Sequence, residues 1–160
     1  MKLRYFVIVV TLVLFSFGAE AQNYRTGLGA RLGYFNGLTV KHFVSESNAI
    51  EGIASFRWNG FIITGLYEWQ KPIRNANGLD YFLGIGGHVG AWGRGDRWWG
   101  NAPYDDDGFT IVGIDFIAGL EYTFAEVPFN IGLDWKPALN FGGYRWWGDG
   151  IALSIRYTFR

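Results

Sequence analysis

Apolar and polar residues alternate along most of this chain with a period of two. The clearest segment runs from residue 151 to the end of the chain. One of its faces carries Ile151, Leu153, Ile155, Tyr157 and Phe159, and the other carries Ala152, Ser154, Arg156, Thr158 and Arg160. Successive side chains of a β-strand point to opposite faces, whereas a helix repeats about every 3.6 residues. The segment therefore predicts a strand with one apolar face, one polar face and aromatic residues near its end.

The same alternation predicts about eight strands and no helix after residue 22. We expect these strands at Tyr24–Tyr34, Leu38–Val44, Ile50–Trp58, Phe61–Gln70, Leu79–Trp92, Phe109–Phe124, Phe129–Leu139 and Ile151–Arg160. Tight hairpin turns are predicted at Asn36-Gly37 and Asn59-Gly60, because Asn-Gly favours the backbone of two-residue turns. Pro137 cannot donate a ladder hydrogen bond, so we expect it at a strand end or a bulge.

The first 21 residues have the pattern of a secretory signal peptide. A short basic start is followed by an apolar run, Tyr5–Phe17, and by the small-residue pattern Ala19-Glu20-Ala21. The run of about 13 residues is short for a membrane-spanning helix, which needs about 20. We therefore predict export, cleavage before Gln22 and one domain over residues 22–160. A retained membrane anchor is the alternative.

The face that points inward separates a membrane barrel from a soluble one. A membrane barrel is apolar outside and polar inside, and a soluble barrel is the reverse. Many glycines lie on the polar face, where a narrow lumen is crowded. That face also carries nearly balanced charges, as a closed polar core requires. The predicted lumen network comprises Arg25, Arg31, Lys41, Glu51, Arg57, Glu68, Asp80, His88, Asp115, Glu121, Asp134, Lys136 and Arg156. These features favour an eight-stranded antiparallel transmembrane β-barrel.

Composition agrees with a membrane barrel and excludes several function classes. The chain has 24 Gly, 8 Trp, 9 Tyr and 14 Phe, which suits aromatic girdles at a membrane interface. Its 14 basic and 14 acidic residues leave no basic excess for nucleic acid. With no cysteine, it has no disulfide and no thiolate metal site. The acidic stretch Asp105–Asp107 lacks the spacing of a calcium loop, so we predict neither a metal nor a cofactor.

Three segments carry a resemblance to a known group of proteins: the terminal strand Ile151–Arg160, residues 132–137 (Gly-Leu-Asp-Trp-Lys-Pro) and residues 84–90 (Gly-Ile-Gly-Gly-His-Val-Gly). The chain resembles the small OmpA/OmpX-like outer-membrane barrels, including those of the Bacteroidetes. The resemblance implies a monomer in the cell outer membrane, inserted by the barrel-insertion machinery through its C-terminal strand. It also implies a structural or surface-interaction role.

An Arg-Trp-Trp-Gly tetrad occurs in each of two segments that we expect at the outer surface. The residues of this predicted outer rim are Arg97, Trp98, Trp99, Arg145, Trp146 and Trp147. Arginine pairs with phosphate and tryptophan favours the headgroup region, so we predict contact with lipopolysaccharide. The alternative is an ordinary aromatic girdle with arginines reaching the interface. About eight strands leave a lumen filled by side chains, so a general pore is not predicted.

An enzyme is the alternative from a different class. Some eight-stranded barrels acylate or deacylate lipid A, which requires a hydroxyl nucleophile within hydrogen-bond reach of a base. His88 is expected in the lumen near Asp80, but the pattern places no serine beside it. We therefore predict no enzymatic activity. A contact between His88 and Ser154 would favour the lipid-modifying enzyme instead.

Overall fold

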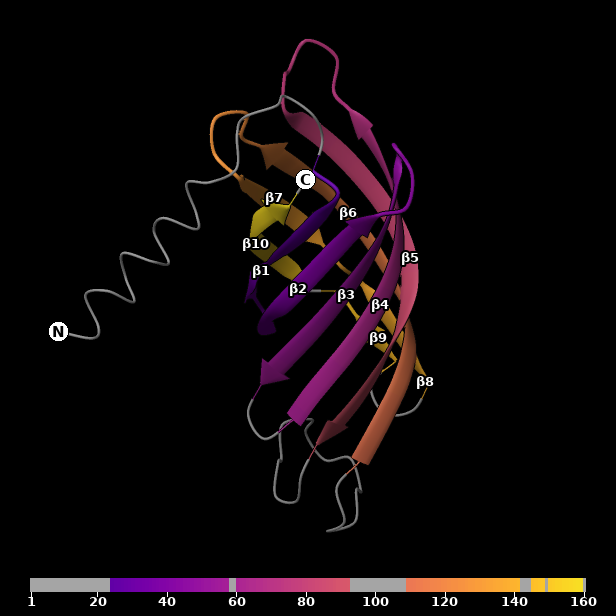
Figure 1. The fold of residues 1–160 in the computed structure, drawn as a ribbon. Coiled ribbons are helices and arrows are strands. Elements are labelled where there is room, and N and C mark those ends of the chain that lie inside the picture. Colours follow the sequence, from indigo (N-terminus) through magenta and orange to yellow (C-terminus); the bar gives the residue numbers. More distant parts are fainter. Residues whose placement is uncertain (1–23, 58–59, 93–108, 142–144, 149, 160) are drawn as a thin grey trace, which may run out of the picture.

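The structure is a computed structural model that describes residues 24–57, 60–92, 109–141, 145–148 and 150–159. Its strands are Thr26–Gly33 (β1), Asn36–Phe43 (β2), Asn48–Arg57 (β3), Gly60–Pro72 (β4), Leu79–Trp92 (β5), Phe109–Thr123 (β6), Phe129–Trp135 (β7), Ala138–Phe141 (β8), Trp146–Trp147 (β9) and Ile151–Phe159 (β10). All pairings are antiparallel. Because β1 pairs with β10 and β5 pairs with β6, the sheet closes into a barrel (Figure 1).

The ten strands form eight staves. β7 and β8 pair with β6 in one register, from Ala118 opposite Trp135 to Asp115 opposite Ala138, so they are two parts of one stave. β9 pairs with β8 and β10 pairs with β7, which makes β9 and β10 the neighbouring stave. Pro137 lies in the gap between β7 and β8, where its carbonyl accepts a hydrogen bond from the Phe116 amide. The predictions of eight strands and of Pro137 at a strand end are confirmed.

The first predicted turn lies two residues away from its expected position. Asn36 and Gly37 begin β2, and the turn lies at Tyr34 and Phe35 instead. The Asn36 side chain explains the difference, because its Oδ1 accepts a hydrogen bond from the Gly33 amide at 3.1 Å. Asparagine therefore closes the turn through its side chain rather than its backbone. At the second predicted turn, Arg57 pairs with Gly60, so Gly60 belongs to β4, while Asn59 lies outside the described residues.

The barrel has two distinct ends. At the terminal end, Thr26 pairs with Phe159, and the turns around residues 45–47, 73–78 and 124–128 connect neighbouring strands. At the loop end lie the Tyr34-Phe35 turn and the ends of the strands that residues 58–59, 93–108 and 142–145 connect. The terminal end is uppermost in Figure 1. The beginning of β1 and the end of β10 therefore lie at the same end of the barrel.

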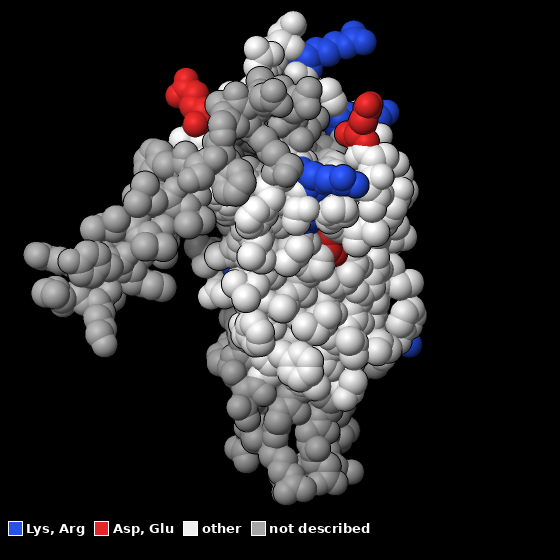
Figure 2. Space-filling view, in the orientation of Figure 1, with Lys and Arg blue, Asp and Glu red and all other residues white. Residues whose placement is uncertain are grey.

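The outer wall is apolar. Leu28, Leu120, Leu133 and Ile155 are among its many exposed hydrophobic side chains. Charged residues gather at the terminal end in the view of Figure 2, and the wall below them is nearly free of charge. Aromatic side chains lie toward both ends of the wall: Tyr67, Trp69, Tyr81, Tyr122 and Phe159 at the terminal end, and Phe56, Phe61, Phe141 and Trp146 at the loop end. This polarity is that of a barrel whose exterior faces lipid.

Among the described residues, no helix is long and apolar enough to span a membrane.

Candidate functional site in the barrel lumen

Five buried ionisable side chains form a cluster in the half of the lumen nearer the terminal end. This inner cluster consists of Lys41, Glu51, Glu68, Glu121 and Arg156, which come from β2, β3, β4, β6 and β10. Lys41 Nζ lies 2.8 Å from Glu68 Oε2 and 3.1 Å from Glu121 Oε2. Arg156 binds Glu51 through one terminal nitrogen and lies 3.2 Å from Glu121 through the other. Glu121 therefore bridges the two cations.

Neutral polar groups complete the inner cluster. The Tyr24 hydroxyl donates to Glu121 Oε1 at 2.6 Å and accepts from Asn130 Nδ2 at 3.1 Å. Gln70 Nε2 donates to the same Glu121 oxygen at 3.2 Å and to Asp80 Oδ2 at 2.9 Å. Buried charges destabilise a fold unless they are paired and hydrogen-bonded. Glu121 meets that condition more fully than the other carboxylates, because it accepts from both cations and from two neutral donors.

Charge is not balanced within the inner cluster. It holds three carboxyl groups, those of Glu51, Glu68 and Glu121, against the two cations Lys41 and Arg156. Glu121 meets both cations, whereas Glu51 and Glu68 each meet one. Glu51 also accepts a hydrogen bond from the Thr39 hydroxyl, and no such neutral donor reaches Glu68 among the described residues. The excess negative charge is therefore least compensated at Glu68.

An apolar layer from β3, β4, β5 and β6 lies in the lumen beside the inner cluster. Ile53, Leu66, Phe82 and Ile117 pack together there and are fully buried. Lys41 Nζ lies 4.3 Å from the centre of the Phe82 ring, a distance at which the ring face attracts a cation. The alternation of the sequence did not reveal this layer, because its apolar residues occupy positions on the polar face. Their position in the alternation could have revealed them. Ile53 lies two residues after Glu51, and Ile117 lies two residues after Asp115, so each shares the lumen-facing side of its strand with a charged residue.

A second cluster lies in the half of the lumen nearer the loop end. His88 Nδ1 and Asp115 Oδ2 are 2.7 Å apart, and Lys136 Nζ contacts the other oxygen of Asp115. Trp147 of β9 stacks on the His88 ring, with centroids 5.4 Å apart and planes inclined by 14°. A separate buried ion pair joins Arg31 to Asp134. Charged pairs and an aromatic stack thus occupy this half of the lumen.

Glycine makes room for the largest of these side chains. A Cβ on Gly113 would lie 2.5 Å from His88 Cε1, and one on Gly119 would lie 2.5 Å from Phe82 Cζ. A Cβ on Gly132 would lie 3.2 Å from Arg156 Nη1. Each glycine faces a bulky side chain from another stave. The glycines on the polar face therefore create the space that the lumen side chains occupy, as the sequence indicated.

Most residues of the predicted lumen network lie in the lumen. The structure buries Arg31, Lys41, Glu51, Glu68, His88, Asp115, Glu121, Asp134 and Arg156, and half-buries Asp80 and Lys136. Arg25 is an error of the prediction, because its side chain is exposed. It precedes β1, and its amide donates to the Phe159 carbonyl while its own carbonyl accepts from the Phe43 amide. It therefore lies at the rim of the barrel rather than in the wall. The Arg57 side chain lies outside the described part of the chain.

The predicted outer rim divides in two. Arg97, Trp98 and Trp99 lie outside the described residues. Arg145 is exposed and Trp146 is 48% exposed on the outer wall. Trp147 contradicts the prediction, because neighbouring residues of a strand point to opposite faces and its ring turns inward onto His88. Trp147 therefore belongs to the lumen.

The geometry does not assemble the catalytic contact that would favour an enzyme. His88 Nε2 and Ser154 Oγ are both buried, and neither has a hydrogen-bond partner among the described residues. His88 and Asp115 thus form a base-and-carboxylate pair with no hydroxyl bonded to the base. The described residues also contain no group of three acidic, histidine or cysteine side chains that could hold a metal ion.

Comparison with known proteins identifies the architecture. No protein-family model matches the chain, and no curated protein matches its sequence. Among solved structures, the chain is similar to the N-terminal β-barrel domain of Pseudomonas aeruginosa OprF, with a TM-score of 0.63 and 14% identity over 86% of this chain and 100% of that one. At this identity the likeness shows the fold. The predicted OmpA-like small barrel is confirmed as an architecture, and the resemblance to Bacteroidetes proteins stays a prediction.

Proposed function

We propose that this chain is an outer-membrane barrel with a structural and surface-interaction role. In this proposal the signal peptide, residues 1–21, is removed on export and the C-terminal strand β10 is read by the barrel-insertion machinery. The mature protein is a monomer whose terminal end faces the periplasm. Its loop end faces outward, where it contacts lipopolysaccharide.

One observation carries the proposal: the barrel is apolar outside and charged inside. Leu133 is 54% exposed on the wall, whereas its neighbour Asp134 is buried against Arg31. In water, exposure of this apolar wall and burial of these charges would destabilise the barrel. In a bilayer, the apolar wall contacts lipid and the barrel is stabilised. The contents of the lumen support a structural role rather than general diffusion, because buried ion pairs and the apolar layer lie within it.

Fractionation and N-terminal sequencing test the location. The mature protein should be recovered with the outer membrane, begin at Gln22 or within a residue or two, and shift its gel mobility on heating as folded barrels do. Recovery of an uncleaved chain in the inner membrane would contradict the proposal.

A paired variant tests the contact with lipopolysaccharide. Arg97→Ala combined with Arg145→Ala keeps every tryptophan and removes two cations of the predicted rim. Binding to lipopolysaccharide-containing vesicles should weaken and become less sensitive to salt, because fewer ion pairs with phosphate remain. Arg25→Ala combined with Arg74→Ala is the matched control, since both arginines are exposed at the terminal end. Equal binding by the rim variant and the wild type would contradict the lipopolysaccharide contact and favour an ordinary aromatic girdle.

A further inference from the structure

Glu68 is the carboxyl of the inner cluster that its neighbours compensate least, and it is fully buried. Its side chain and that of Lys41 have no exposed surface. An added Cβ on Gly84 of β5 would lie 2.9 Å from Glu68 Cγ, and Leu66, two residues earlier on the same side of β4, belongs to the apolar layer. A negative charge on this carboxyl therefore depends on nearby protein groups rather than on water.

Two ionisable groups face Glu68 from neighbouring staves. Lys41 of β2 lies 2.8 Å from its Oε2, but the same ammonium also contacts Glu121. Glu51 of β3 pairs with Leu66, so it is the diagonal neighbour of Glu68 on the lumen side of the wall. The carboxyl groups of Glu51 and Glu68 lie within hydrogen-bonding reach of each other. Glu68 thus has a shared cation on one side and a second carboxyl on the other.

The oxygens of this carboxyl pair lack donors. Glu51 Oε1 accepts from Thr39 and Arg156, whereas no described residue donates a hydrogen bond to Glu51 Oε2 or to Glu68 Oε1. Two ionised carboxylates cannot bond each other, because neither carries a hydrogen. A proton on one of them supplies the missing donor and removes one of two like charges.

The other ionisable groups of this half of the lumen are already engaged. Arg156 contacts Glu51 and Glu121, the Tyr24 hydroxyl donates to Glu121, and Asp80 of β5 accepts from Gln70. None of them brings a further positive charge to Glu68.

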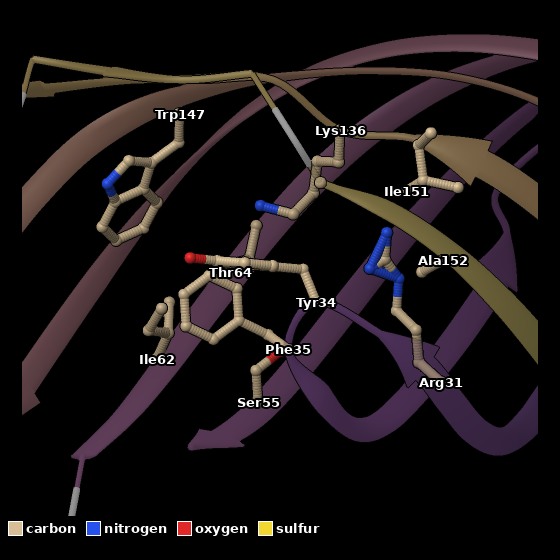
Figure 3. A pocket seen from close by; sticks show the side chains of 11 residues that line it. Arg31, Tyr34, Phe35, Ser55, Ile62, Thr64, Lys136, Trp147, Ile151 and Ala152 are labelled. Atoms are coloured by element: carbon tan, nitrogen blue, oxygen red, sulfur yellow. The ribbon is translucent and has the colours of Figure 1, made fainter. Parts of the chain in front are cut away.

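The loop-end half does not offset the extra carboxyl either. Arg31 and Lys136, which line the pocket in Figure 3, are paired with Asp134 and Asp115. His88 contacts the same Asp115. In the part of the lumen that the structure describes, the excess carboxyl therefore stays with the inner cluster.

We propose that the carboxyl groups of Glu51 and Glu68 together form a proton-binding site, which holds one proton in the folded barrel at neutral pH. With that proton, the inner cluster contains two negative and two positive charges. The site exists only in the folded barrel, because the pairing of β3 with β4 brings the two carboxyls together. In the unfolded chain both glutamates are ionised at neutral pH, since the ordinary pKa of glutamate is about 4.3. Folding at neutral pH therefore takes up one proton.

Infrared spectroscopy of the mature barrel in lipid vesicles at neutral pH tests the site directly. A protonated carboxyl absorbs apart from a carboxylate and from a glutamine amide. The wild type should show this band, and Glu68→Gln should lose it. Glu51→Gln should lose it as well, because Glu68 is then free to ionise beside Lys41. Glu126→Gln, exposed in the turn before β7, is the matched control and should keep it.

Unfolding in urea measures the proton that folding takes up. Between about pH 6 and about pH 8, the unfolding equilibrium constant of the wild type, divided by that of Glu68→Gln, should rise about tenfold per pH unit. The reason is that the wild type releases one more proton on unfolding than the variant does. The same ratio formed with Glu126→Gln should not depend on pH, and taking ratios cancels the other titrating groups.

Two results would overturn the proposal. The first is wild-type protein without a protonated-carboxyl band at neutral pH, including the case in which a bound sodium ion compensates both carboxylates. The second is folded Glu68→Gln protein that keeps the band or unfolds with the same pH dependence as the wild type. If Glu68→Gln does not fold, the wild-type spectrum and Glu51→Gln decide the question.

Discussion

The glycines of the barrel wall differ in what surrounds them. At Gly113 and Gly119 an added Cβ would meet a ring at 2.5 Å and a carbonyl oxygen within 2.6 Å. At Gly65, which faces outward, an added Cβ would meet nothing within 4 Å. The same substitution therefore has opposite consequences on the two sides of one wall.

Replacing glycine by alanine should reproduce this contrast. Gly113→Ala and Gly119→Ala should each destabilise the barrel by about 1–3 kcal/mol, because an overfilled lumen forces ring and backbone apart. Gly65→Ala should be neutral or stabilise it by up to about 1 kcal/mol, because alanine restricts the unfolded chain. Urea-induced unfolding in lipid vesicles, followed by tryptophan fluorescence, measures all three. An equal effect at Gly65 and Gly113 would contradict the crowding argument.

Two buried glutamates should respond differently to the same change. Glu121→Gln removes the carboxylate that bridges Lys41 and Arg156 and should cost on the order of 3–5 kcal/mol, as breaking a buried pair does. Glu68→Gln removes the excess carboxylate of the inner cluster and should cost clearly less. The exposed Glu126→Gln, expected within about 0.5 kcal/mol of the wild type, is the control. The order of the three unfolding free energies is the measurement, and a larger loss at Glu68 than at Glu121 would refute the charge count.

At the scale of the element, successive residues of a strand in this wall face the lipid and the lumen in turn. Leu133 lies in the stave of β7 and β8, between Phe129 toward the terminal end and Phe141 toward the loop end, and it pairs with Leu120 and Leu153 on the neighbouring staves. Its exposed side chain thus lies in the apolar part of the wall.

A charge at this position should be costly. Leu133→Arg should destabilise the folded barrel in bilayers by about 2–4 kcal/mol, the cost of arginine near the membrane midplane. Val127→Arg is the matched control in the turn before β7, with an expected cost of at most about 1 kcal/mol near the interface. Folding titrations in lipid vesicles compare the two. If both variants lost the same stability, the wall would not be lipid-facing at Leu133.

Strands were predictable from sequence because alternation is a local property. The expected Leu79–Trp92 strand matches β5, and the expected Phe109–Phe124 strand ends one residue beyond β6. The turn at Tyr34 was missed because a hydrogen bond from the Gly33 amide to the Asn36 side chain, not the Asn-Gly dipeptide, fixes it. Most lumen charges were predictable from parity alone. Their partners were not, because the pairing of residues as distant as Glu51 and Arg156 depends on how the staves are staggered.

The inward turn of Trp147 illustrates the same limit. Its neighbour Trp146 is chemically identical, so composition cannot separate a girdle residue from a lumen residue. Parity separates them only after the start of the strand is known, and a shift of one residue reverses every assignment. The apolar layer was missed for a related reason, because Leu66 and Ile117 resemble exceptions to the alternation until the staves are assembled.

For the whole molecule, strand number and closure decide which segments share a side. Antiparallel staves bring both ends of the barrel sequence to the terminal end, together with the turns at residues 45–47 and 73–78. In the proposed orientation these segments face the periplasm.

An epitope inserted at Glu46 should be hidden from antibody in intact cells and become accessible when the outer membrane is opened. The same epitope inserted within residues 93–108 should be accessible in intact cells, because that segment joins β5 to β6 at the loop end. Surface labelling of both insertions, with a periplasmic protein as a leakage control, gives the comparison. Labelling at Glu46 in intact cells would reverse the orientation.

The ladder between β1 and β10 also makes the barrel a candidate for circular permutation. Thr26 lies opposite Phe159, so a short linker could join the two ends while new ends are opened between β5 and β6. The barrel would then be closed by a covalent link between β1 and β10 and by strand pairing between β5 and β6. Because every stave keeps its neighbours, the permuted barrel should fold in detergent with the native lumen. Under the proposed function, in which the insertion machinery reads β10 as the last strand, the permutant should assemble poorly in cells. Such a permutant would separate the physics of closing this barrel from the biology of inserting it.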